Sequence, residues 1–292
     1  MKVGFAAILG RPNVGKSTLL NGLLSKKISI VSPRAQTTRD AVSGVLTEKD
    51  AQIVFVDTPG IYYGEEKLDS HMRRAAFSSS RDVDVLLYLL DASVASLEED
   101  FRIFRSIDSA APRFFVLNKI DLIHIEQAEK LTAEIREAFP DVPLIRASFI
   151  ENFGFKEVKE AILPFLKEGQ PFYPEDVLSD KDMNFQAREI IREKLLHFLR
   201  EEVPHQSAVR IGLFEEKKGG IVLEATVICD KPAHKAIIIG KGGAMIKKIS
   251  MAARQEMERV FHTRILSLKL DVECVPGWRS SPGALNALGY GQ

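Results

Sequence analysis

The stretch GRPNVGKST, residues 10–18, constrains the fold of this chain more than any other feature. It satisfies the pattern G-x-x-x-x-G-K-[ST], in which the glycines let backbone amides surround phosphate groups. An apolar run of strand length, residues 3–10, precedes the loop, and a helical pattern at 16–25 follows it. A glycine loop that opens a helix favours anions, because free N–H groups point out of the helix N-terminus. The chain therefore starts with a predicted phosphate-binding strand–loop–helix unit.

Strand-like and helix-like segments continue to alternate through residue 168. We expect strands at 3–10, 41–48, 51–58, 83–91, 113–120 and 143–148, and helices at 16–25, 97–107 and 154–168. This alternation predicts an α/β domain with a mostly parallel sheet covered by helices on both faces. Ligands of such domains bind at the carboxyl ends of the strands.

A smaller α+β domain is expected at 182–275, after a linker at 169–181 and before a C-terminal tail at 276–292. Asp182 suits the N-cap of a helix over about 185–202, in which Ile191, Leu195, Phe198 and Leu199 share one face. A hairpin (207–216 and 220–230), the loop GKGG (240–243), a helix (243–261) and a strand (264–273) follow. The order helix–strand–strand–helix–helix–strand resembles that of a type II KH domain.

The zero net charge of the 292 residues conceals a basic segment. Residues 231–264 contain eight Lys or Arg against two Glu, a local charge of +6 that favours a polyanion over a merely solvated helix face. Cys229 and Cys274 lie in apolar runs without a CxxC motif, so we expect buried thiols in a reducing compartment. The scattered histidines predict no zinc site, and no signal peptide or membrane-spanning run is evident. We therefore expect a soluble intracellular protein.

Polar residues at predicted strand ends extend the phosphate site. Lys16 is expected to reach the β- and γ-phosphate oxygens, and the Ser17 hydroxyl to bind Mg²⁺. Asp57 and Gly60 of DTPG are expected to contact Mg²⁺ through water and the γ-phosphate through an amide. The loop residues expected around the phosphates are Gly10, Asn13, Val14, Gly15, Lys16, Ser17 and Thr18.

The motif NKID, residues 118–121, indicates which base is bound. Asp121 can accept from two N–H donors that guanine presents and adenine does not. Asn118 can bond the base edge, and the Lys119 stem can cover the ring. A kinase or ATPase that uses the same phosphate loop is the rival interpretation, and NKID argues against it.

The motifs GRPNVGKST, AQTTRD, DTPG and NKID, in this order, resemble the translation-factor class of P-loop GTPases. The resemblance implies that Thr38 is a magnesium ligand, with Thr37 as the alternative. The fifth motif is imperfect, because Arg146-Ala147-Ser148 stands where relatives have Ser-Ala. The Ala147 amide is expected to meet the guanine carbonyl, with Ser148 beside it.

The second glycine loop, GKGG, fits the G-x-x-G pattern with which KH domains clamp about four single-stranded nucleotides. The alternative is a glycine turn that only joins two helices. The apolar residues 237–239 are expected to form a floor for bases, and Arg254 to add positive charge. The expected RNA-binding residues are Ile239, Gly240, Lys241, Gly242, Gly243, Lys247 and Lys248.

A GTPase domain followed by a KH domain resembles the Era family over nearly the whole chain. Further matching stretches are KKISIVS (26–32), FYPEDVLSD (172–180), EIIREKLLHFLREEVP (189–204) and GWRSSPGALNALGY (277–290). The resemblance implies hydrolysis of GTP to GDP with Mg²⁺, binding to the 3′ end of small-subunit ribosomal RNA and to the small subunit, and a role in its assembly. It also implies a cytoplasmic, bacterial-type monomer with peripheral contact to the inner face of the membrane, although no residue pattern independently supports membrane binding. A nucleotide-switched RNA-modification factor is the alternative, but no residues remain for its further domain.

The position that holds a water-orienting glutamine in Ras-like enzymes is Ile61 here. Slow hydrolysis is therefore expected until another group completes the site. Asn13 is a candidate, because its side-chain oxygen can bind K⁺ against the phosphates; the alternative is that Asn13 only caps a turn. Together with Lys16, Thr38 and Gly60, Asn13 completes the predicted catalytic set.

Overall fold

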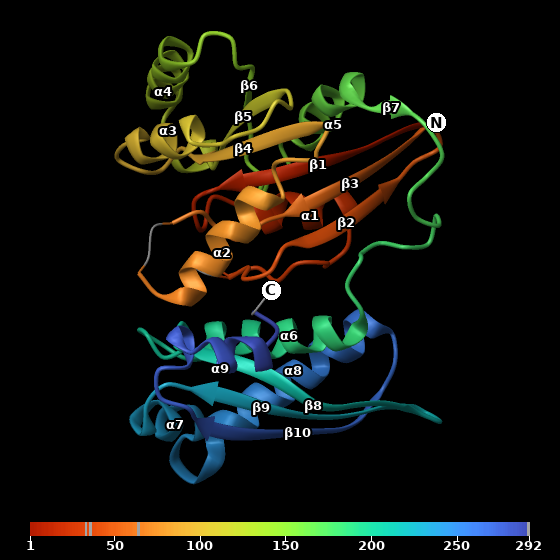
Figure 1. Cartoon of the computed structure of the whole chain (residues 1–292), viewed down its shortest axis with the longest axis vertical. Helices are drawn as coiled ribbons and strands as arrows, with labels where there is room; N and C mark the ends of the chain where they lie inside the picture. The colour runs from red at the N-terminus through yellow and green to blue at the C-terminus, as the bar shows by residue number, and fades with distance from the viewer. Residues whose placement is uncertain (33, 35–36, 63–64, 291–292) are drawn as a thin grey trace. The chain divides into compact units, whose positions relative to one another are not determined.

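The computed structural model describes residues 1–32, 34, 37–62 and 65–290. Residues 35 and 36, which open the AQTTRD stretch, and residues 291 and 292 of the expected tail lie outside the described residues. The chain forms two compact units, one of residues 1–63 and 72–180 and the other of residues 64–71 and 181–292 (Figure 1).

The first unit is built on one sheet with the strand order β2-β3-β1-β4-β5-β6. Strands β1, β3, β4, β5 and β6 are parallel, β2 is antiparallel to β3, and the short β7 is antiparallel to β1. The bounds are β1 (Lys2–Gly10), β2 (Val42–Thr47), β3 (Ala51–Asp57), β4 (Val85–Asp91), β5 (Arg113–Asn118), β6 (Leu144–Arg146) and β7 (Lys167–Glu168). The register pairs Ile8 with Asp57 and Asp91 with Asn118, so the polar strand ends meet at one edge.

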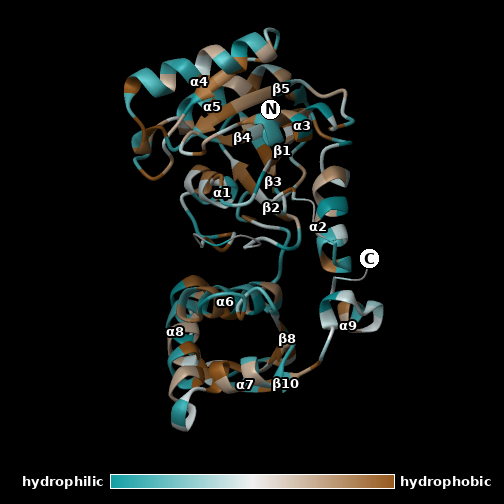
Figure 2. Ribbon diagram, turned by 90° about the vertical axis from the view of Figure 1, so that its left-hand side faces the viewer, coloured by the Kyte–Doolittle hydropathy of each residue, from teal (hydrophilic) through white to brown (hydrophobic). Residues whose placement is uncertain are grey.

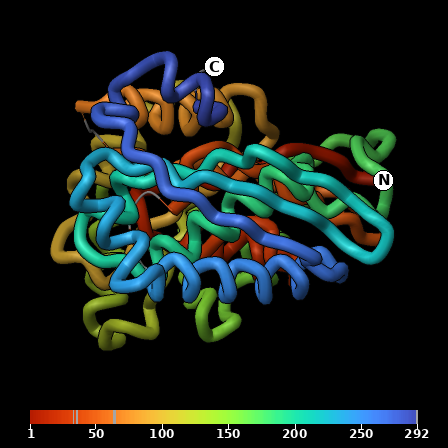
Figure 3. Tube along the Cα trace, turned by 90° about the horizontal axis from the view of Figure 1, so that it is seen from below, coloured from red at the N-terminus to blue at the C-terminus, as the bar shows by residue number. Residues whose placement is uncertain are grey.

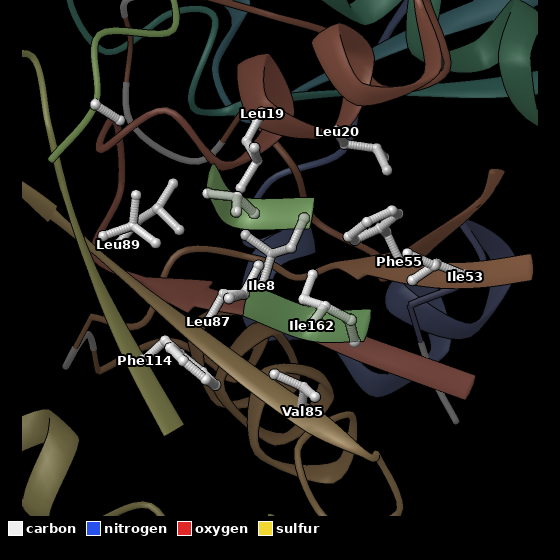
Figure 4. Close-up of a cluster of buried hydrophobic side chains, with 14 of the residues drawn as sticks. Ile8, Leu19, Leu20, Ile53, Phe55, Val85, Leu87, Leu89, Phe114 and Ile162 are labelled. Carbon is white, nitrogen blue, oxygen red and sulfur yellow. The ribbon is translucent and has the colours of Figure 1, made fainter. Parts of the chain in front are cut away.

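Helices cover both faces of this sheet, as the alternating pattern predicts. They are α1 (Lys16–Leu24), α2 (Lys67–Ser78), α3 (Glu98–Arg105), α4 (Ile125–Ala138) and α5 (Phe155–Ile162). Consecutive strand residues point to opposite faces: Ile8 and Leu87 lie in the cluster with α1 and α5 (Figure 4), whereas Leu9 and Tyr88 lie in the cluster with α3 and α4. Strands β4 and β5 are therefore apolar between their polar end residues (Figure 2).

Two parts of the first unit differ from the sequence-based expectation. The helix expected over 154–168 ends at Ile162, because Pro164 cannot donate a backbone hydrogen bond; a 3₁₀ turn (Leu163–Phe165) follows and then β7. Helices α2 and α4 were not predicted. Residues 177–180 of the expected linker lie along β2, where Ser179 forms a β-bridge with Gly44.

The second unit has the predicted order of elements. They are α6 (Met183–Phe198), β8 (Ser207–Lys217), β9 (Gly220–Cys229), α7 (Pro232–Ile239), α8 (Ala244–Phe261), β10 (Ile265–Cys274) and α9 (Pro282–Ala287). The sheet order is β10-β9-β8, with β8 antiparallel and β10 parallel to β9 (Figure 3). Asp182 caps α6 by accepting from the Phe185 amide at 2.7 Å, as expected, but the helix ends at Phe198 rather than near 202.

The core of this unit lies between the sheet and helices α6, α7 and α8. Ile191, Leu195 and Leu199 are buried in it as the helical pattern predicts, whereas Phe198 is only partly buried. The tail adds the fully buried Trp278, whose indole donates to the Gln206 carbonyl. Arg279 contacts Glu66 and Asp69 at 2.6 and 3.2 Å, within the same compact unit.

The two cysteines are unpaired in the structure. Cys229 is buried as expected, but Cys274 is partly exposed because β10 is an edge strand; both are free thiols. Within the described ranges, no group of three or more His, Cys, Asp or Glu is placed to hold a metal ion. None of the helices in this part of the chain is long and apolar enough to span a membrane.

Candidate phosphate and nucleic-acid sites

One pocket of about 450 Å³ at the carboxyl edge of the first sheet gathers most of the predicted site residues. The expected residues that line it are Asn13, Gly15, Lys16, Ser17, Thr18, Thr38, Gly60, Asn118, Lys119 and Asp121. Three further expected residues, Gly10, Val14 and Asp57, do not line the pocket themselves. Their contacts are with lining residues: Gly10 and Val14 accept hydrogen bonds from Lys16 and Asn118, and Asp57 accepts one from Ser17.

Lys16 is held in the phosphate loop by the loop's own backbone. Its ammonium group donates to the carbonyls of Gly10 and Arg11 at 3.0 and 2.7 Å. Burial lowers the pKa of Lys16 to about 8, because the charged form loses hydration. Phosphate oxygens would supply the negative charge that these carbonyls lack.

Three hydroxyl groups converge on the carboxylate of Asp57. Its Oδ2 accepts from Ser17 at 2.7 Å, from Ser29 at 2.8 Å and from Thr38 at 3.4 Å, and the Ser17 and Thr38 hydroxyls lie 3.0 Å apart. Burial raises the pKa of Asp57, which Lys16 and the hydroxyl donors oppose. In the described part of the chain, Oδ1 of Asp57 is buried and accepts no hydrogen bond. This set of hard oxygen donors with an unsatisfied carboxylate oxygen fits a magnesium ion.

The two threonines of the TTRD stretch have different hydrogen-bond partners. Thr38 is buried beside Ser17 and Asp57, whereas the Thr37 hydroxyl donates to the Arg34 carbonyl at 2.6 Å. The arrangement therefore favours Thr38 over Thr37 as the metal-facing residue.

The base end of the pocket is organised by side-chain contacts between strand ends. Asn118 donates to the Val14 carbonyl and accepts from the Phe149 amide, so it ties the phosphate loop to the segment after β6. A side chain at Gly15 would collide with the Asn118 amide, so a glycine is required there. Lys119 forms an ion pair with Asp91, and the Ser148 hydroxyl donates to Asp121. Asp91 was not among the residues predicted for this site, and its signal in the sequence is its place at the end of β4.

The structure contradicts the expected role of the Ala147 amide. Ala147 is fully buried, does not line the pocket, and donates to the Leu117 carbonyl at 2.9 Å. That amide continues the sheet, so it cannot meet a guanine carbonyl. Phe149 and Ile150 line the pocket instead, directly after Ser148. Of the two residues expected here, Ser148 reaches the guanine motif with its side chain, through its hydrogen bond to Asp121.

Ile61 cannot act on a phosphate from its position. Its side chain is fully buried in the cluster with Leu9 and Tyr88, and its amide donates to the Gly10 carbonyl at 3.1 Å. Asn13, by contrast, lines the pocket with a left-handed backbone (φ 64°). That conformation is common for asparagine in turns, so it is compatible with both roles considered for Asn13.

The second glycine loop joins α7 to α8 in the second unit. Gly240, Gly242 and Gly243 all have positive φ, and the Gly243 amide donates to the Gly240 carbonyl. Lys241 and Gly242 are exposed at its tip, where backbone and charge are accessible to a ligand. Such a turn presents N–H groups and a helix N-terminus to a phosphate backbone.

The basic residues around this loop differ in how much of their charge is compensated. Lys247 and Lys248 are exposed on α8, and the Lys248 ammonium lies 4.5 Å from the centre of the Phe198 ring. Arg254 pairs with Glu258 and Arg259 with Glu256 along the helix. The expected floor of residues 237–239 is corrected: Ile238 is in the core, and only Ile237 and Ile239 reach the surface.

Known protein families match both parts of the chain that contain these sites. A family model described as a 50S ribosome-binding GTPase matches residues 5–119, and a KH-domain model matches residues 202–278. GTPase Era of Ruminiclostridium cellulolyticum is 40% identical over 291 residues, which is 99% of this chain and 97% of that protein. The chain belongs to the Era family of GTPases.

Solved Era structures agree with this assignment over the whole chain. Era in complex with MgGDPNP and nucleotides 1506–1542 of 16S ribosomal RNA is 38% identical, with a TM-score of 0.96 and 100% coverage of both chains. A variant of Aquifex aeolicus Era bound to GDP and AlF₄⁻ is 38% identical, with a TM-score of 0.95 and the same coverage. The chain is thus an Era-family GTPase with a C-terminal KH domain, which confirms the resemblance drawn from its motifs.

Proposed function

We propose that this chain binds and hydrolyses GTP with Mg²⁺, binds small-subunit ribosomal RNA near its 3′ end through the KH domain, and assists assembly of the small ribosomal subunit. The observation that carries the nucleotide half is the single pocket of about 450 Å³ that is lined by the phosphate loop, Thr38 and the NKID motif together. A pocket for another anion would not need Asp121 at its far end.

Each group in the pocket has a role in this proposal. Lys16 and the amides of the phosphate loop bind the β- and γ-phosphates, and the Gly60 amide meets the γ-phosphate. Ser17, Thr38 and Asp57 hold Mg²⁺, which supplies positive charge to the phosphate oxygens. Asp121, oriented by Ser148, accepts from guanine, and Lys119 covers the ring.

The RNA half of the proposal rests on the GKGG turn and on the Era structure that contains 16S ribosomal RNA. Ile239, the loop glycines and Lys241 are proposed to contact the RNA backbone and bases, and Lys247 and Lys248 to neutralise phosphates. Crosslinking in cells followed by sequencing of the bound RNA tests this half. Enrichment of the 3′ end of small-subunit ribosomal RNA is expected, and enrichment of transfer RNA alone would contradict it.

Guanine recognition is tested by Asp121→Asn. An amide can donate where the carboxylate only accepts, so the variant should prefer xanthine, and its GTP affinity should fall about a hundredfold because charged hydrogen bonds are lost. Competition between GTP, XTP and ATP for a fluorescent nucleotide measures this. Exposed Glu126→Gln on α4 is the matched control. An Asp121→Asn protein that binds GTP as tightly as wild type would place the base elsewhere.

A monovalent cation is proposed to complete the hydrolytic site. Ile61 has no hydrogen-bonding side-chain atom and is buried, and positive charge against the phosphates is a route to stabilise the transition state without it. Asn13 is the proposed K⁺ ligand. Turnover is expected to be faster in K⁺ than in Na⁺ at equal ionic strength, and Asn13→Ala should remove the difference. Equal rates in both salts with a silent Asn13→Ala would leave activation to the RNA or ribosomal partner.

The location proposed for this activity is the cytoplasm, with peripheral contact to the inner face of the cell membrane. The support for membrane contact is the family resemblance alone. Co-sedimentation with anionic lipid vesicles, with and without GTP, tests it, and absence of the protein from the vesicle pellet in both states would remove this part of the proposal.

A further inference from the structure

A serine outside all of the nucleotide motifs contacts the carboxylate that is proposed to hold Mg²⁺. Ser29 lies in the KKISIVS stretch, is only 3% exposed, and donates to Asp57 Oδ2 at 2.8 Å. Ile30, Val31 and Ser32 line the pocket, whereas Ser29 does not. The Ser29 hydroxyl therefore contacts the site through Asp57.

The backbone of Ser29 is fixed by one side chain of α1. The Asn21 side-chain oxygen accepts from the amides of Ile28 and Ser29 at 2.8 and 2.9 Å, and its nitrogen donates to the Ser29 carbonyl at 2.7 Å. Asn21 follows Ser17 by about one helical turn on α1. The same helix thus places Ser17, which faces the metal position, and the support of Ser29.

We infer that Ser29 is a positioning residue for Asp57 in magnesium binding, held in place by Asn21. Two hydroxyl donors on Oδ2, from Ser29 and Ser17, fix the plane of the carboxylate and leave Oδ1 without a protein partner in the described chain. A donor from Ser29 also stabilises the buried anion, which burial alone disfavours. This inference rests on the proposed function in taking Mg²⁺ as the cofactor.

Removal of such a supporting hydrogen bond should weaken Mg²⁺ binding and leave the phosphate contacts intact. Groups that orient metal ligands typically contribute tenfold or more to metal affinity. In Ser29→Ala, the Mg²⁺ concentration that half-saturates tight binding of fluorescent GDP should therefore rise about tenfold. Affinity for GDP in EDTA should match wild type, because Lys16 and the loop amides are unchanged.

The matched control is Ser80→Ala. Ser80 is 1% exposed, and its hydroxyl donates to the Phe77 carbonyl at 2.7 Å, outside the pocket. This variant removes an equally buried hydroxyl and should keep the wild-type Mg²⁺ requirement. Asn21→Ala, which frees the backbone of Ser29 without touching its hydroxyl, should raise the Mg²⁺ requirement in the same direction as Ser29→Ala.

A double-mutant cycle separates positioning from packing. In an Asp57→Ala background, Ser29→Ala should cause no further change in Mg²⁺ requirement, because the carboxylate that Ser29 positions is absent. The inference is wrong if Ser29→Ala keeps the Mg²⁺ requirement of Ser80→Ala, or if GDP affinity in EDTA falls as much as affinity in Mg²⁺. If Ser29→Ala does not fold, an unchanged Mg²⁺ requirement in Asn21→Ala overturns it equally. Wild-type affinity that is indifferent to Mg²⁺ would instead refute the proposed cofactor.

Discussion

At the scale of single residues, the phosphate loop is braced by two acidic residues of α3, of which Asp100 is buried and Glu99 is partly exposed. Arg11 forms ion pairs with Glu99 at 2.7 Å and with Asp100 at 3.5 Å, and Asp100 also accepts from the Tyr88 hydroxyl at 3.3 Å. Asp100 is only 2% exposed, and burial raises its pKa to about 6. The Arg11 carbonyl in turn accepts from Lys16, so this cluster reaches the nucleotide site through one residue.

Asp100 should make the stability of the protein pH-dependent. Its folded pKa, about 6, exceeds the unfolded value of about 3.9, so the folded state binds more protons between these values and stability falls as pH rises through them. The free energy of unfolding of wild type minus that of Asp100→Asn should fall by about 2–3 kcal/mol from pH 4 to pH 7. Urea unfolding at each pH measures the difference. A difference for Asp100→Asn that stays flat with pH would show that burial does not shift this group.

At the scale of elements, residues 172–180 at the end of the first unit are held along β2 and β3 rather than left as a free tether. The Val45 amide donates to the Leu178 carbonyl at 2.9 Å, and the Ser43 amide donates to Asp180 at 2.9 Å. Gln52, which is fully buried on β3, accepts from the amides of Phe172 and Tyr173 and donates to the Tyr173 carbonyl. One side chain thus satisfies the backbone of a segment that has no regular structure of its own.

Gln52→Ala should release this segment while the sheet stays folded. The amides of Phe172 and Tyr173 would lose the acceptor that holds them against β3. Hydrogen exchange of residues 172–180 should then become at least about tenfold faster, with no change in β4 and β5. Gln127→Ala on the exposed face of α4 is the control. Unchanged exchange at 172–180 would mean that the contacts of β2 suffice to hold the segment.

The KH loop offers an element-scale test of RNA binding. A side chain at Gly240 would meet Met245 at 2.7 Å, so substitution there disturbs α8 as well as the ligand surface. Gly242 has open space around it and φ 58°, which Asp tolerates better than most residues. Lys241→Asp with Gly242→Asp should therefore weaken RNA binding about a hundredfold without unfolding the domain, through charge repulsion of the phosphates.

Lys218→Asp with Gly219→Asp is the matched control for the loop variant. It makes the same charge change at the open turn between β8 and β9, where Gly219 also has no neighbour within 4 Å. Binding to single-stranded RNA at several salt concentrations measures both proteins, and wild-type log affinity should fall by about 0.7 for each phosphate neutralised per tenfold rise in salt. Equal losses in the two variants would mean that RNA responds to overall charge and not to the loop.

At the scale of the whole molecule, the chain has separate hydrophobic cores for its two ligands. The two clusters of the first unit and the cluster of the second share no residue. A ligand that binds only one folded unit stabilises that unit by mass action. The two proposed functions should therefore be visible as separate effects on stability.

Calorimetry with each ligand tests this separation. GTP with Mg²⁺ at about 100 times its Kd should add about 2.7 kcal/mol to the first unit and raise its Tm by roughly 5–10 °C. Single-stranded RNA should raise only the transition of the second unit, and Lys16→Ala should remove the nucleotide shift and keep the RNA shift. A single transition that both ligands move equally would show that the units unfold as one.

The sequence by itself determined the two domains, their order of elements and most of the nucleotide pocket. Strand periodicity, the glycine loop and polar strand ends are local patterns, and parallel strands bring their ends to one edge whatever the details of packing. For this reason Lys16, Ser17, Asn118 and Asp121 could be placed from the sequence alone. The local order around GKGG was sufficient for the KH fold in the same way.

Only the tertiary structure decided which groups near these motifs are available. The Ala147 amide donates to the carbonyl of Leu117, so it is not available to a guanine carbonyl. Ser29 meets Asp57 across 28 residues of sequence, and Arg11 meets Asp100 across 89. No periodicity encodes such contacts, because they depend on the pairing of distant strands and on side chains that compete for the same oxygen.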